Sequence, residues 1–257
     1  MSAAPDMSAQ EMPTVVLIHG AFAGSSSWNG VIANLKRRGY PVVAVANPLR
    51  GVQKDAAYVR ALLDSVPGPV VMAAHSYGGL VMTEAAAGAS NVKALVYVAS
   101  VSPDVGESVI ELVGKYPGSQ LPSSISMVPI PSDDGGTTMD QYLLQDKFPE
   151  VFAADVDPET AKIMAATQRP ASASAQEEGV TKVAWKTIPS WTLITTQDQG
   201  IPPDLQRFLA QRAGSTTVEI AASHAVAVSQ PGPVADLIDT AARATARSMQ
   251  MSKSRQG

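Results

Sequence analysis

The sequence of 257 residues contains no cysteine, which excludes a disulfide framework and a thiolate metal site. It also lacks any apolar run near the roughly 20 residues that a membrane-spanning helix needs. The stretch Met1–Met12 has neither the basic nor the apolar region of a signal peptide. We therefore expect a soluble chain and take the cytoplasm as the default location, although a mature secreted or periplasmic form would look the same.

Basic side chains are in slight deficit, with 19 Lys and Arg against 23 Asp and Glu and a net charge of −4. Nucleic acids and anionic membranes recruit proteins through clustered Lys and Arg, so we expect neither as a partner. The sequence has no Gly-rich phosphate loop and no His, Asp and Glu set with metal-ligand spacing. Neither a cofactor nor a metal is implied, and no feature fixes an oligomeric state.

The composition is that of an ordinary folded domain, with 45% hydrophobic and 16% charged residues. A chain of this length can bury a full core as one unit, so a single domain is predicted over residues 1–257.

Short apolar segments alternate with helical patterns along the chain. Continuous apolar runs of strand length, separated by helices, are typical of a parallel sheet covered on both faces. The predicted fold is therefore α/β, with a doubly wound and mostly parallel sheet. The expected strands are Thr14–Ile18, Pro41–Ala46, Val70–Ala74, Ala94–Ala99, Trp191–Thr195 and Thr217–Ala221. The expected helices are Trp28–Arg38, Gln53–Ser65, Gly79–Ala87, Asp204–Ala213 and Pro233–Arg247.

The alternation is interrupted between about Pro103 and Pro189, where no strand pattern is convincing. Turn-rich sequence there surrounds short helical patterns at Met139–Lys147 and Pro158–Gln168. Because a plain loop of this length is unusual in a compact domain, we predict a small helical cap inserted at about 103–189.

Ser76 follows the apolar strand and precedes a helix, in the sequence Ala74-His75-Ser76-Tyr77-Gly78-Gly79. A nucleophile on a sharp strand-to-helix turn leaves no room for large neighbours, and the residues two before and two after Ser76 are small. The turn would place the Ser76 hydroxyl at the carboxyl edge of the sheet, at a helix N-terminus that favours developing negative charge. Taken alone, however, such a serine is more often a structural turn residue.

This segment resembles the Gly-x-Ser-x-Gly nucleophile elbow of α/β hydrolases, with Ala74 in place of the first glycine. Upstream, Val15-Val16-Leu17-Ile18-His19-Gly20-Ala21-Phe22 is similar to the strand and His-Gly oxyanion loop of that family. The pair of motifs is much more specific than either one. The resemblance implies that the backbone N–H groups of Ala21 and Tyr77 form an oxyanion hole.

A serine nucleophile needs a histidine base oriented by a carboxylate, and the chain has only three histidines. His19 belongs to the oxyanion loop and His75 should point away from the serine, so both are expected to be structural. His224 remains as the base. It follows the last predicted strand, in agreement with the family order of serine, acid and histidine.

The acid is expected after the penultimate strand, where Asp198 lies in a segment that resembles the acid loop of the family. Asp104 is the competitor, because some members take the acid from the preceding strand, although it is more simply a turn or helix-capping residue. The apolar residues of the cap are expected to be mainly packing residues, some of which must roof the site. They are Met127, Met139, Tyr142, Leu143, Phe148, Phe152, Met164 and Trp185.

The set of motifs is most similar to small cofactor-independent esterases of the methyl-ester esterase and hydroxynitrile lyase group. It implies a serine esterase that cleaves small to medium hydrophobic esters through an acyl-enzyme. Two alternatives stay open, because fold alone does not fix the reaction. One is a lyase that uses the same triad as a proton shuttle, with Lys182 or Lys186 as the extra cation; the other is a ligand receptor on a hydrolase scaffold.

Overall fold

The computed structural model describes residues 12–132 and 135–254, with side chains up to residue 246. Most of the Met1–Met12 stretch considered above lies outside the described residues. A parallel sheet of six strands has the order β2-β1-β3-β4-β8-β9. Its strands are β1 (Thr14–Ile18), β2 (Val42–Val45), β3 (Val70–Ser76), β4 (Val92–Ser100), β8 (Ser190–Thr195) and β9 (Thr216–Ile220). The predicted doubly wound fold is confirmed.

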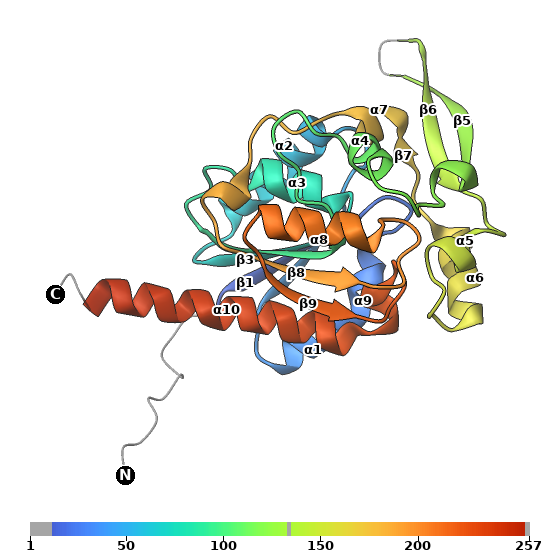
Figure 1. Ribbon diagram of the computed structural model, residues 1–257. Helices are drawn as coiled ribbons and strands as arrows, with labels where there is room; N and C mark the ends of the chain where they lie inside the picture. The colour runs from blue at the N-terminus through green and yellow to red at the C-terminus, as the bar shows by residue number, and fades with distance from the viewer. Residues whose placement is uncertain (1–11, 133–134, 255–257) are drawn as a thin grey trace.

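Helices cover both faces of the sheet (Figure 1). Side chains alternate along a strand, so Val15 and Leu17 pack into one core and Val16 and Ile18 into the other. The first core lies under α1 (Asn29–Arg37) and α10 (Pro231–Ser254), joined by the short α9 (Val226–Ser229) and a 3-10 turn, η2 (Ser25–Trp28). The second lies under α2 (Val52–Ser65), α3 (Gly78–Ala85) and α8 (Pro203–Arg212).

The segment between β4 and β8 forms the cap, and it is not purely helical. It contains the α-helices α4 (Val109–Gly114), α5 (Phe148–Val151), α6 (Pro158–Thr167) and α7 (Ala173–Glu177), with 3-10 turns η3 (Pro122–Ser124) and η4 (Ala184–Lys186). It also contains an antiparallel sheet of β5 (Ile125–Pro131), β6 (Thr137–Leu143) and β7 (Ala171–Ser172). The β5–β6 hairpin projects from the body of the molecule (Figure 1).

The helix predicted at Met139–Lys147 is therefore wrong, because most of that stretch belongs to β6. No sign of a strand partner for β6 is visible in the sequence, because β5 contains Pro129 and Pro131, and prolines argue against a strand. β5 is an edge strand, where a missing N–H on the outer side costs no ladder hydrogen bond. Pairing with β5 stabilises the strand conformation of β6. No local sequence pattern reveals this pairing.

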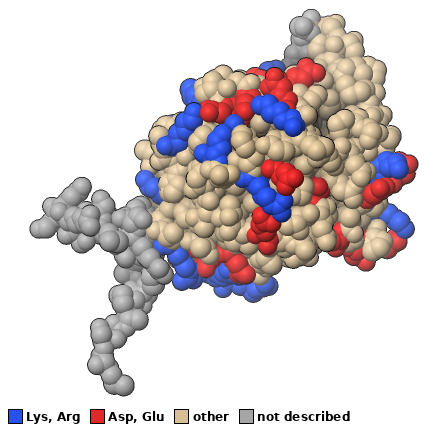
Figure 2. Space-filling view, viewed as in Figure 1, with Lys and Arg blue, Asp and Glu red and all other residues tan. Residues whose placement is uncertain are grey.

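Basic and acidic side chains are interspersed on the face seen in Figure 2, with no large area of a single sign. Exposed ion pairs occur at the protein surface, such as that of Arg207 with Glu219 at 2.7 Å. Within the described ranges, no helix combines the length and the apolarity that a membrane span requires.

Candidate active site

Ser76 ends β3 and has a φ of 54°, a left-handed conformation that costs a non-glycine residue about 1–3 kcal/mol. The Ser100 hydroxyl donates to the Ser76 carbonyl at 2.7 Å and supports the turn. The small residues around Ser76 also have a direct cause. A Cβ on Gly78 would lie 2.8 Å from the Ile18 carbonyl oxygen, so a larger residue would push the elbow away from β1.

The loop after β1 approaches the elbow closely at Gly20. A Cβ at this position would lie 2.6 Å from the Ser76 Cβ, so only glycine allows the approach. The approach brings Ala21 and Tyr77 to the same cavity as Ser76. Across residues 12–132 and 135–254, neither of their backbone N–H groups donates a hydrogen bond, so both are available to a substrate oxygen.

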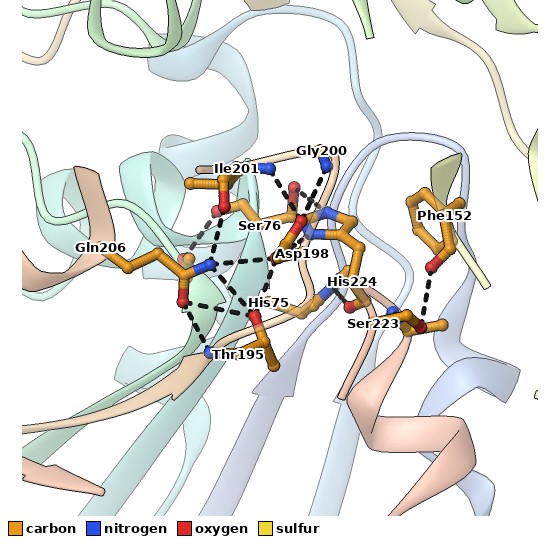
Figure 3. A network of polar contacts seen from close by, with 12 residues as sticks. His75, Ser76, Phe152, Thr195, Asp198, Gly200, Ile201, Gln206, Ser223 and His224 are labelled. Atoms are coloured by element: carbon orange, nitrogen blue, oxygen red, sulfur yellow. Dashed lines mark hydrogen bonds and ion pairs between the residues drawn. The ribbon is translucent and has the colours of Figure 1, made fainter. Parts of the chain in front are cut away.

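His224 lies between Ser76 and Asp198 (Figure 3). Its Nε2 is 2.9 Å from the Ser76 Oγ, and its Nδ1 is 2.8 Å from Asp198 Oδ2. Ser76 is the last residue of β3, while Asp198 and His224 lie in the loops after β8 and β9, and all three side chains are buried. The carboxyl edge of the parallel sheet thus brings together the three residues that the sequence singles out.

Asp198 is fixed by hydrogen bonds to both carboxylate oxygens. Oδ1 accepts the backbone N–H groups of Gly200 at 2.8 Å and Ile201 at 2.9 Å. Oδ2 accepts the Thr195 hydroxyl at 2.8 Å and the Gln206 amide at 3.0 Å, besides His224 (Figure 3). Every lone-pair direction of the carboxylate is therefore used, and the face presented to His224 cannot rotate away.

Sequence reasoning missed Thr195 and Gln206. A signal for Gln206 existed, because it shares the buried face of α8 with Leu205 and Leu209 and is itself fully buried. A polar residue inside an apolar helical stripe needs a partner. No comparable signal marks Thr195, whose hydroxyl acquires its role only through the turn that follows β8.

His75 points away from Ser76, as predicted, and acts on the loop of His224. Its Nε2 donates to the His224 carbonyl at 2.8 Å, and the two rings lie 4.6 Å apart. Burial, together with the proximity of His224, holds the pKa of His75 well below its ordinary value. A neutral His75 therefore fixes the backbone of His224 without adding a charge.

His19 holds the oxyanion loop. Its Nδ1 donates to the Gly20 carbonyl at 2.9 Å, and its Nε2 accepts the Asn47 N–H at 3.1 Å. Arg169 of the cap also contacts this loop. Its guanidinium lies 3.2 Å from the same Nε2, and its backbone carbonyl accepts a hydrogen bond from the Phe22 N–H at 3.0 Å. Burial, reinforced by the positive charge of Arg169, lowers the pKa of His19 to about 4.

A cavity of about 360 Å³ opens onto Ser76 and His224. Of the eight apolar cap residues that the sequence singles out, only Phe152 is among its lining residues, and its ring meets His224 edge-on at 4.8 Å. The sequence missed the rest of the apolar wall, which includes Val109 and Val113 of α4. Among the described residues, no Asp, Glu, Lys or Arg lines this cavity, and no cluster suited to a metal ion occurs.

Asp104, the competing acid, lies at the protein surface. Its carboxylate accepts the Lys186 ammonium at 2.6 Å, and this hydrogen bond lowers its pKa. Lys186 is further occupied by the Trp185 ring. Neither Lys186 nor Lys182 lines the cavity, so neither cation proposed for a lyase reaction is at the candidate site.

Comparisons with known proteins agree with this architecture. An alpha/beta hydrolase of Aspergillus novofumigatus, nvfD, is 24% identical over 251 residues, covering 90% of this chain and 96% of the relative. The structure of polyneuridine aldehyde esterase superposes with a TM-score of 0.77 at 18% identity, over 89% of this chain and 98% of that one. A methylesterase from Arabidopsis has a TM-score of 0.72 at 17% identity, with the same coverage.

The sequence profile of the alpha/beta hydrolase family matches residues 15–237. This range includes both glycine-containing loops around Ser76 and the segments that carry Asp198 and His224. The resemblance noted from the sequence is thereby confirmed, and the chain belongs to the alpha/beta hydrolase family.

Proposed function

We propose that the protein is a serine esterase that hydrolyses small to medium, mainly hydrophobic carboxylic esters. The observation that carries this proposal is the continuous hydrogen-bonded chain from Ser76 through His224 to Asp198, at distances of 2.9 and 2.8 Å, with the serine open to an uncharged cavity. A serine hydroxyl becomes nucleophilic when an oriented histidine accepts its proton.

In the first half of the reaction, the His224 Nε2 takes the Ser76 proton while the Ser76 Oγ forms a bond to the acyl carbon. The carbonyl oxygen becomes an oxyanion and accepts the N–H groups of Ala21 and Tyr77, each worth about 3–4 kcal/mol in transition states of this kind. The ester C–O bond then breaks, and His224 returns the proton to the departing alcohol.

In the second half, a water molecule gives a proton to His224 and attacks the acyl-enzyme. The same two N–H groups bind the second oxyanion, and the carboxylic acid leaves as Ser76 regains its proton. Asp198 keeps a proton on the His224 Nδ1 and stabilises the imidazolium that forms in both halves. Because all the groups needed belong to this chain, no step needs a cofactor.

Substrate size follows from the cavity. Its volume of about 360 Å³ lies near the lower end of the range of ligand pockets, roughly 300–1,000 Å³. Its walls contain Phe152, Val109 and Ile201, which favour an apolar acyl or alcohol group.

The test compares turnover of p-nitrophenyl acetate and butyrate by wild type and Ser76→Ala. We expect the variant to lose turnover on the order of 10⁶-fold, because the nucleophile of a triad acts as a unit with its base. A fluorophosphonate should label wild type and not the variant. The matched control is Ser123→Ala, in which the exposed cap residue Ser123 loses the same hydroxyl; it should behave as wild type.

Unchanged turnover in Ser76→Ala would sink the assignment of the nucleophile. A hydrolase-fold receptor would give a different result, because the bound ester would dissociate intact more rapidly than it is hydrolysed. Single-turnover kinetics that show dissociation outrunning hydrolysis for every ester tested would therefore favour the receptor over the esterase.

A further inference from the structure

Gln141 is a buried polar side chain in the cap whose carboxamide oxygen has no hydrogen-bond partner among the described residues. The residue is only 9% exposed. It also lines the cavity that contains Ser76 and His224. A buried acceptor left without a donor is destabilising, so its retention in a ligand cavity calls for a partner that arrives with the ligand.

The position of Gln141 in the fold is rigid. It lies on β6, the middle strand of the cap sheet, opposite Met127 of β5 and Ala171 of β7. The preceding residue, Asp140, points to the opposite side of the strand, as alternation requires, and binds Arg50 at 2.6 Å. The backbone of Gln141 is thus fixed on both edges, while its side chain is directed to the cavity side.

The terminal torsion of a glutamine is soft, so the carboxamide can turn and offer its oxygen to a ligand. The rest of the cavity supplies few polar groups. Gln176 of α7 is the second carboxamide in the lining, and no charged side chain competes for a polar substituent among the described residues.

On the basis of the proposed esterase function, we infer that Gln141 is a specificity-determining residue that accepts a hydrogen bond from a hydroxyl or N–H group of the substrate, at a position other than the ester being cleaved. The substrate is therefore an ester with an apolar body and one hydrogen-bond donor. A site built around such a bond rejects an analogue without the donor, because the buried acceptor then stays unpaired.

The experiment uses esters matched in size that differ in one substituent. In the acyl arm, methyl hydroxyphenylacetates are compared with their methyl- and methoxy-substituted counterparts at the 3 and 4 ring positions. In the alcohol arm, the same substituents are placed on 2-phenylethyl acetate. The two arms locate the donor on the acyl or the alcohol side.

For wild type, Gln141→Met and Gln145→Met, the measured quantity is the ratio of kcat/KM for the hydroxyl-substituted ester to kcat/KM for the methyl-substituted ester. Met is close to Gln in shape but cannot accept this bond. Gln145 follows β6, is exposed, and lies outside the cavity, so its substitution is the matched control. In at least one arm, Gln141→Met should lower the ratio about 10- to 100-fold, and Gln145→Met should leave it unchanged.

A ratio that is the same in wild type and Gln141→Met in both arms would overturn the inference. A methoxy ester that matches the hydroxyl ester in wild type would also overturn it, because the carboxamide would then act as the donor. Ser76→Ala separates this failure from failure of the proposed function. If Ser76→Ala abolishes turnover of every ester in the panel while Gln141→Met changes no ratio, only the inference about Gln141 is wrong.

Discussion

The carboxyl edge of the main sheet and the cap wall line the same cavity. They differ in whether their polar side chains have hydrogen-bond partners within the protein. At the sheet edge, Asp198 accepts bonds at both oxygens and His75 fixes the backbone of His224. On the cap wall, the carboxamide oxygen of Gln141 has no hydrogen-bond partner in the part of the chain that the structure describes. The acid and the base proposed for the chemistry are therefore hydrogen-bonded before a ligand arrives, whereas the acceptor proposed for selectivity is paired only when a ligand binds.

This contrast has a physical basis. A catalytic group accelerates a reaction most when its dipoles are oriented in advance and need no reorganisation. A group that selects a ligand gains its discrimination when the ligand completes an otherwise costly unpaired site. Substitutions on the two sides should therefore differ in kind, with loss of turnover on one side and altered preference on the other.

The largest effect outside the nucleophile is expected at Asp198. Asp198→Asn keeps the shape but offers an amide N–H to His224, so the imidazole takes the wrong tautomer and loses the negative charge that stabilises its protonated form. We expect kcat to fall on the order of 10⁴-fold, measured with p-nitrophenyl acetate.

Asp104→Asn is the matched comparison for the same chemical change at the surface. Its turnover should stay close to that of wild type, because Asp104 binds Lys186 rather than His224. If Asp104→Asn lost turnover while Asp198→Asn kept it, the contrast between the sheet edge and the remainder of the protein would be wrongly drawn.

A second prediction concerns His19, which joins the oxyanion loop to Arg169 of the cap. Its pKa of about 4 lies below the ordinary 6.5, so the unfolded chain binds a proton at a higher pH than the folded one. The stability that neutral His19 contributes is present in full above pH 6.5 and is lost as the pH falls towards 4. Buried His75, whose pKa is also lowered, acts in the same direction.

Urea unfolding at pH 7 and pH 5 measures this effect. The contribution of His19 to the loss of unfolding free energy over that interval should be about 2 kcal/mol. Gln at position 19 can supply a neutral acceptor, so His19→Gln should have a smaller drop by about that amount. An equal drop in the variant and in wild type would mean that the folded state accommodates a charged His19 at the junction.

The smallest effect is expected at Lys186, on the outer surface of the cap. Its ion pair with Asp104 is half exposed, and pairs of this kind contribute about 0–1 kcal/mol. Lys186→Met should change the unfolding free energy by less than about 1 kcal/mol and leave kcat/KM unchanged. A large loss of turnover would instead give Lys186 a part in the chemistry and favour the lyase alternative.

The parts of the fold that the sequence predicted well are those in which local pattern and tertiary environment agree. The apolar run at Val70–Ala74 and the helix-forming stretch after Gly78 lie within two residues of β3 and α3. The helix predicted at Met139–Lys147 failed because its strand geometry depends on pairing with β5. The local periodicity of β6 contains no information about its pairing with β5, and the prolines of β5 argue against a strand there.

The candidate site divides in the same way. The sequence by itself predicted the sharp turn at Ser76, the His-Gly loop after the first strand and the order of Asp198 and His224, because small residues and strand ends are local features of the chain. Only the tertiary structure decided that His224 binds Asp198 rather than Asp104, that Gln206 binds the acid, and that the Gln141 oxygen beside the cavity finds no partner within residues 12–132 and 135–254. Hydrogen-bond partners far apart in sequence are chosen by packing, and packing is a property of the whole fold.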